Sequence, residues 1–134
     1  MNKPLQLTTF RIGNPAQPGQ GLRVGVTRRP PCSIPKDRWV AEGLFDVWLP
    51  VLAPSARLVA DIMKKQHGPA AAFQKALDRY ERELLSTAEG RQSVEFIAQI
   101  AARMPIAIGC FCEDESRCHR SRLFKIITEH AHKA

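Results

Sequence analysis

The pattern of apolar and polar positions predicts three strands, one from alternation and two from short apolar runs. Residues 5–12 alternate between the two classes and include β-branched threonines, which is typical of a strand with one buried face. Residues 22–27 and 106–111 are short apolar runs and predict two more strands. The segment that follows residue 27 contains Pro30, Pro31 and Pro35, which exclude regular structure there.

Helical spacing of apolar side chains fills most of the remaining sequence. It predicts amphipathic helices over residues 55–66, 70–88, 92–103 and 117–131. Strands separated by long helical stretches indicate an α/β fold, here one small domain over residues 1–134 with a mostly parallel sheet flanked by helices. Right-handed crossovers would place strand 22–27 beside strand 106–111 and bring the loops that follow them together.

Composition and charge limit the partners and the location that we expect for this protein. The 134 residues carry a formal net charge of +7, and the pI is about 9.7. This basic balance permits weak, salt-sensitive nucleic-acid binding but does not require it. The sequence contains neither a signal-peptide pattern nor an apolar stretch long enough for a bilayer, so we expect a cytoplasmic protein without a membrane partner. The oligomeric state stays open.

The densest chemistry lies in the sequence CFCEDESRCHRS, residues 110–121, which joins the last predicted strand to the last predicted helix. Such a junction offers free backbone N–H groups and the positive end of a helix dipole, which suit an anion or a thiolate. Cys118 and Cys112 are therefore candidate nucleophiles, and His119 is a candidate general base. The alternative for each is a buried structural role.

Arginines on the two loops predict an anion pocket. Arg28 and Arg29 follow strand 22–27, and Arg120 follows strand 106–111. If the strands are neighbours, these guanidinium groups can bind one phosphate or carboxylate, so we expect a small anionic ligand as partner. In the alternative, the arginines pair with the acidic run at residues 113–115.

Zinc is the competing interpretation of the cysteines. Cys110, Cys112, Cys118 and His119 offer four nitrogen and sulfur ligands, and Cys32 could replace one of them. However, adjacent Cys118 and His119 would point about 100° apart if both were helical. We therefore expect no stoichiometric zinc and no other cofactor. A glycine-rich nucleotide-binding motif is also missing from the sequence.

Several motifs resemble those of a known family. They are GLRVGVTRRPPCSIPK, DVWLPVLAPS, RYEREL and CFCEDESRCHRSRL. Together they cover nearly the whole chain and resemble the YeaO-like branch of the DUF488 family. Four positions depart from that branch, which usually has Asp, Trp, Arg and Gly where this chain has Thr27, Pro30, Cys32 and Ser33. The resemblance implies a compact α/β fold and carries no activity with it.

The functional expectation follows from the site residues. A cysteine nucleophile beside arginines is suited to thiol-dependent group transfer or hydrolysis on a phosphate- or sulfur-bearing substrate. The alternative is a basic module that binds nucleic acid or regulates a partner without catalysis.

Overall fold

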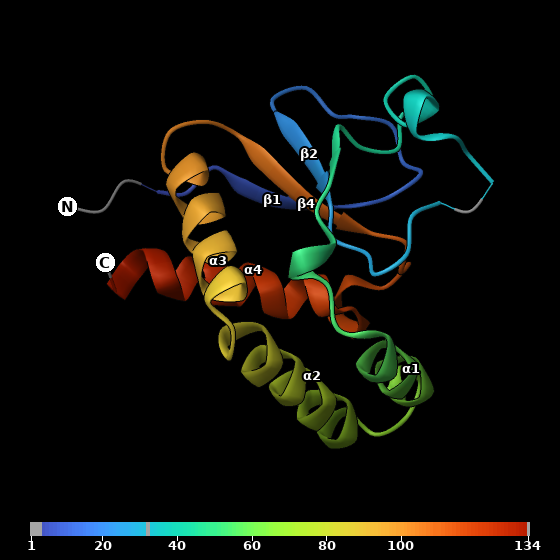
Figure 1. Ribbon diagram of the computed structural model, residues 1–134, viewed down its shortest axis with the longest axis vertical. Coiled ribbons are helices and arrows are strands. Elements are labelled where there is room, and N and C mark those ends of the chain that lie inside the picture. Colours follow the sequence, from blue (N-terminus) through green and yellow to red (C-terminus); the bar gives the residue numbers. More distant parts are fainter. Residues whose placement is uncertain (1–3, 32, 134) are drawn as a thin grey trace.

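The strands form one parallel sheet in a computed structural model that describes residues 4–31 and 33–133 (Figure 1). They are β1 (Leu7–Arg11), β2 (Leu22–Gly25), β3 (Val47–Trp48) and β4 (Ile106–Cys110). The order across the sheet is β1-β4-β2-β3, and every neighbouring pair is parallel. Leu22 lies opposite Ile106, so the predicted pairing of the second apolar run with the last one is confirmed.

Helices make up most of the remaining described chain. The α-helices are α1 (Ala56–Lys65), α2 (Ala70–Leu85), α3 (Ala88–Ala101) and α4 (His119–Lys133). Three short 3-10 helices are η1 (Lys36–Arg38), η2 (Pro50–Leu52) and η3 (Glu115–Arg117). The predicted small α/β fold with a parallel sheet is therefore confirmed. None of the helices described is both long and apolar enough to cross a membrane.

The two faces of the sheet are covered differently. On one face, strand residues such as Ile106 and Ile108 pack with buried side chains of all four α-helices, including Phe73 and Ile127. This face holds the main core, because burial of apolar side chains from helices and strands is the largest favourable term in folding.

The opposite face is covered by the connection between β2 and β3 rather than by an α-helix. Trp39 and Phe45 of this connection pack edge to face, with ring centroids 5.0 Å apart. The Phe45 ring lies against Gly25, where an added Cβ would meet it at 2.6 Å, so only glycine fits that strand position without rearrangement. A small second core therefore supports the sheet from this side.

The last helix begins later than predicted. Residues 115–117 form η3, where the Asp114 side chain accepts a hydrogen bond from the backbone N–H of Ser116. Cys118 is extended, with φ −135° and ψ 148°, and α4 starts at His119. An aspartate that binds its own backbone two residues further on favours a turn over a continuous helix. Cys118 therefore stands just outside the helix.

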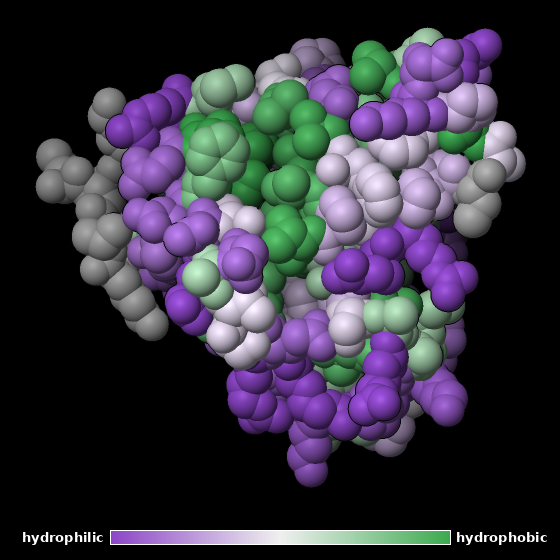
Figure 2. All heavy atoms as spheres, in the orientation of Figure 1, coloured by the Kyte–Doolittle hydropathy of each residue, from purple (hydrophilic) through white to green (hydrophobic). Residues whose placement is uncertain are grey.

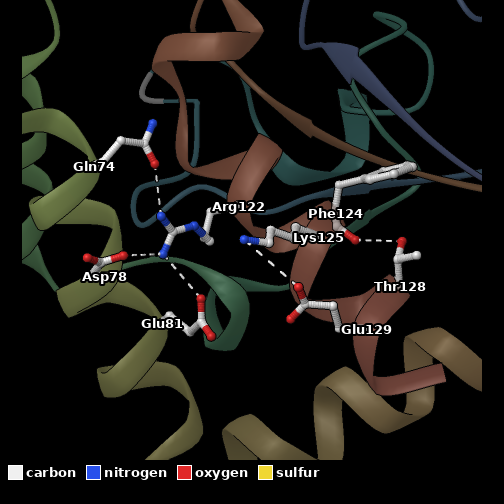
Figure 3. Close-up of polar contacts among 8 residues, drawn as sticks. All are labelled: Gln74, Asp78, Glu81, Arg122, Phe124, Lys125, Thr128 and Glu129. Carbon is white, nitrogen blue, oxygen red and sulfur yellow. Dashed lines mark hydrogen bonds and ion pairs between the residues drawn. The ribbon is translucent and has the colours of Figure 1, made fainter. Parts of the chain in front are cut away.

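Polar contacts fix α4 against α2. The Arg122 side chain is 10% exposed and donates to Asp78 at 2.8 Å, Glu81 at 3.2 Å and Gln74 at 2.9 Å (Figure 3). On the outer side of the same helix, Lys125 pairs with Glu129 at 3.9 Å. These contacts hold the start of α4, and with it the cysteine loop, in a defined position.

The hydropathy of the surface agrees with this packing. Hydrophilic side chains cover the lower part of the molecule, where α2 lies (Figure 2). Hydrophobic side chains reach the surface in the upper middle of the same view. Amphipathic helices that pack one face on a sheet leave a polar outer face of this kind.

Candidate functional site

Three cysteine sulfurs meet at the carboxyl end of β4. Cys110 is the last residue of that strand, Cys112 follows it by two residues, and Cys118 precedes α4. Their Sγ atoms all lie within 4.8 Å of one another, and those of Cys110 and Cys112 are 3.7 Å apart. All three are free thiols. Ligand sites of open α/β sheets lie at this edge, so the predicted cysteine loop forms the candidate site.

Cys112 is the most accessible of the three sulfur-bearing residues. It is half-buried, whereas Cys110 is 6% exposed and Cys118 is fully buried. Hydrogen bonds from the Cys110 and Cys118 thiols lower the pKa of Cys112, and the Gln66 amide, 3.4 Å from the Cys112 sulfur, lowers it further. The surroundings of Cys112 therefore favour a negative sulfur.

Cys118 and Cys110 have the opposite electrostatics. The hydrogen bonds that Cys118 makes to Cys110 and Cys112, together with burial, raise the pKa of the Cys118 thiol. The hydrogen bond to Cys112 likewise raises the pKa of Cys110. The sequence favoured Cys118 for a helix-stabilised thiolate. The structure instead places the Gln66 amide and the Cys110 thiol against the Cys112 sulfur, and it buries Cys118.

His119 is a buried, oriented imidazole. Its Nε2 lies 2.8 Å from the carbonyl oxygen of Val26, an acceptor, so Nε2 carries the proton. Nδ1 therefore has a free lone pair, and it lies 3.9 Å from the Cys118 sulfur. Burial lowers the pKa of His119, which keeps the ring neutral. His119 thus links the end of β2 to the cysteine cluster, and it faces Cys118 rather than solvent.

Arg120 places positive charge beside the sulfurs. It is 4% exposed and donates from Nη1 to the Cys112 carbonyl at 2.8 Å and towards the Cys118 sulfur at 3.8 Å. Its Nε is buried and has no hydrogen-bond partner among the residues that the structure describes. The acidic run does not supply one, since Glu113 pairs with Arg11 at 3.8 Å and Glu115 accepts from the Thr9 hydroxyl. A buried donor without a partner is unusual in a folded protein.

The arginines of the loop that follows β2, Arg28 and Arg29, are placed differently from Arg120. Arg28 donates from Nε to the carbonyl of Pro54 at 2.9 Å, and from Nη2 to the carbonyls of Pro50 and Ala53, each at 3.1 Å. These bonds direct its guanidinium towards η2. Arg29 is exposed. Cys32, the possible fourth cysteine ligand, lies outside the described residues.

Several of the residues that carry the family resemblance make hydrogen bonds around η2. The Tyr80 hydroxyl donates to the carbonyl of Leu52 at 2.5 Å, and the Glu83 carboxylate accepts from the backbone N–H of Ser55 at 2.8 Å. Trp48 donates from its ring nitrogen to the carbonyl of Thr27 at 2.8 Å. Tyr80 and Glu83 therefore fix the chain between β3 and α1, and Trp48 fixes the chain that follows β2.

Sequence reasoning missed one site residue. Gln66 follows α1 and donates to the Cys112 sulfur at 3.4 Å and to the Arg117 carbonyl at 2.9 Å. It is 46 residues away from Cys112 along the chain, and no pattern around it distinguishes it from any other polar residue at a helix end. Only the packing of α1 against the cysteine loop reveals its role.

Comparison with known proteins places the chain in a family. No curated protein and no solved structure matches it. The family model DUF488-N3a, described as the active DUF488-N3 subclade, matches residues 7–131, which include the whole sheet, all four α-helices but the end of α4, and the cysteine cluster. The chain therefore belongs to the DUF488-N3a family, within the wider group that its motifs resemble.

Proposed function

We propose that this protein is a thiol-dependent enzyme that transfers or hydrolyses a phosphate- or sulfur-bearing group, with Cys112 as the attacking residue. The observation that carries the proposal is the meeting of three thiols at the sheet edge, with only Cys112 half-exposed. A nucleophile must be both accessible and stabilised in its charged form. Cys112 combines exposure with hydrogen-bond donors on its sulfur.

We assign the binding and positioning roles to the neighbouring side chains. Arg120 would attract the anionic part of the substrate, because its guanidinium lies beside the Cys112 carbonyl and the Cys118 sulfur. Cys118 would act as a positioning residue, because its sulfur lies within 4.8 Å of the Cys112 sulfur and 3.9 Å from His119 Nδ1. The proposal thus retains Cys112, Cys118, His119 and Arg120, and it gives the leading role to Cys112 rather than Cys118.

The reaction would proceed in two displacements. The Cys112 sulfur forms a bond to an electrophilic phosphorus or sulfur atom, and the leaving group departs with the electron pair of the broken bond. Water or a second nucleophile then takes the group from Cys112 and restores the thiolate. The arginine would stabilise charge on the substrate in both steps.

Family membership supports an enzyme in general terms. The matching subclade is described as active, a word that the description leaves without a substrate. We also propose that the chain belongs to the YeaO-like branch, on the motif residues that match it, several of which lie around η2. That finer placement adds no chemistry, because these residues make structural hydrogen bonds.

Charge selectivity at Cys112 tests the proposal before a substrate is known. The reduced, metal-free protein is alkylated with anionic iodoacetate and with neutral iodoacetamide, and the two rates at Cys112 are followed by peptide mass spectrometry. Arg120 should raise the ratio of iodoacetate to iodoacetamide rates above the ratio measured for the same cysteine in urea. Inorganic phosphate should slow iodoacetate more than iodoacetamide.

A matched variant and two model reactions complete the test. Arg120→Gln should lower the rate ratio to that of the unfolded chain while Cys112 still reacts. Hydrolysis of p-nitrophenyl phosphate would assign a phosphate substrate, and sulfur transfer from thiosulfate to cyanide would assign a sulfur substrate. If Cys112 is unreactive in the folded protein, or shows the unfolded ratio, the proposal is wrong.

A further inference from the structure

We infer that Cys110, Cys112 and Cys118 form a binding site for one thiophilic metal ion such as Zn²⁺ or Cd²⁺. The three Sγ atoms lie within 4.8 Å of one another, at the end of β4 and at the residue before α4. This inference goes beyond the proposed enzyme function, since it assigns a ligand that uses all three sulfurs at once.

The spacing of the sulfurs fits a common centre. Two sulfurs that each lie about 2.3 Å from a tetrahedral zinc ion are about 3.8 Å apart. The Sγ atoms of Cys110 and Cys112 are 3.7 Å apart, close to this edge length. Since no pair in the group exceeds 4.8 Å, small rotations of the side chains would bring all three sulfurs to one ion. The donors are all thiols, which select soft ions over Mg²⁺ or Ca²⁺.

The charges around the cluster also fit. Metal binding releases the thiol protons to solvent. The three thiolates and a divalent cation then carry one net negative charge, which a nearby cation must balance in a buried site. Arg120 is 4% exposed and approaches the Cys118 sulfur at 3.8 Å, and its Nε has no partner within the described part of the chain. Gln66 donates to the Cys112 sulfur at 3.4 Å. Donors that orient and stabilise the ligands in this way are typical of metal sites.

The structure also changes the premise on which the sequence disfavoured zinc. That expectation assumed that Cys118 and His119 both lie in a helix and must ligate together. Cys118 is extended and outside α4, so its sulfur turns towards Cys110 and Cys112 without His119. His119 is not part of the three-sulfur group. The fourth position would be filled by solvent on the half-exposed side of Cys112.

Metal binding and nucleophilic attack would exclude each other, because both use the Cys112 sulfur. A metal ion should therefore protect Cys112 from alkylation and silence the proposed enzyme. Loss of the ion would release the nucleophile. The two proposals are independent in one respect, since the site can bind metal even if Cys112 has no substrate.

Titration of the reduced, chelator-treated full chain with Cd²⁺ tests the site through thiolate-to-metal absorbance in the ultraviolet. We expect saturation at one ion per chain. Cys110→Ser, Cys112→Ser and Cys118→Ser should each weaken binding and reduce the absorbance. Cys32→Ser is the matched control and should bind as the unmodified chain does. Circular dichroism of each variant shows whether it is folded.

Protection of the unmodified chain keeps the test decisive even if a serine variant fails to fold. One equivalent of Cd²⁺ should block iodoacetamide labelling of Cys112, as measured by peptide mass spectrometry. No absorbance change and no protection would overturn the inference, as would binding that survives loss of Cys112 or depends on Cys32. If Cd²⁺ binds at one equivalent but metal-free Cys112 is inert, the metal site stands and the proposed enzyme function fails.

Discussion

Replacing Arg28 with glutamine tests whether this arginine has a structural role or binds a ligand. The guanidinium binds the carbonyls of Pro50, Ala53 and Pro54, and so ties the end of β2 to the turn around η2. Ala53 and Pro54 are buried, so their carbonyls lose partners that water cannot fully replace. Leaving a buried acceptor unsatisfied costs about 1–3 kcal/mol.

For the two buried carbonyls we expect the free energy of unfolding to fall by about 2–4 kcal/mol in total. This is the lower part of the range for two unsatisfied acceptors, because Arg28 is itself only half-buried. Urea denaturation followed by circular dichroism measures this loss. Arg29→Gln is the matched control: Arg29 is exposed, and its substitution should change stability by less than about 0.5 kcal/mol. The reasoning is refuted if Arg28→Gln leaves stability unchanged but abolishes phosphate protection of Cys112, because Arg28 would then bind the anion.

Three further predictions concern stability and the basic surface. Tyr80→Phe removes the buried donor to the Leu52 carbonyl and should cost about 1–3 kcal/mol in urea denaturation, whereas a cost near zero would contradict the buried hydrogen bond. Burial lowers the pKa of His119 below 6.5, so the unfolded chain binds the proton more readily. Its contribution to stability should be complete above about pH 6.5 and decrease as the pH falls below that value. His119→Gln should remove this part of the pH slope, and an unchanged slope would show that another group causes it. Nucleic-acid binding, measured by fluorescence anisotropy, should be weak, independent of sequence and lost as salt rises, because counterion release would drive it. A sequence-selective complex at physiological salt would contradict this.

Periodicity predicted the scaffold because long elements repeat their apolar positions many times. Residues 70–85 supply several helical turns of such positions, and β4 is a fully buried run of five residues. By contrast, β3 has only two residues, Val47 and Trp48, and it exists because β2 offers an unpaired edge. A strand of this length has no periodicity to detect.

The candidate site was located by sequence, but its internal arrangement was not. Clustering of cysteines at a strand end identified the loop, since strand ends and helix starts carry function in α/β folds. The accessible sulfur depends instead on the η3 turn, which Asp114 stabilises and which keeps Cys118 extended and buried. The position of Gln66 depends on how α1 packs, and the direction of Arg28 depends on η2. These are tertiary contacts, and single-residue patterns do not encode them.

The central claim is that Cys112 is the reactive sulfur of the cluster, and the order of cysteine labelling tests it most directly. The reduced, metal-free protein is treated with limiting iodoacetamide at neutral pH, and each cysteine-containing peptide is quantified over time. We predict that Cys112 is modified first, well before Cys110, Cys118 and Cys32, because it joins partial exposure to donors on its sulfur. Equal, slow modification of all four cysteines, or faster modification of Cys118, would contradict the account.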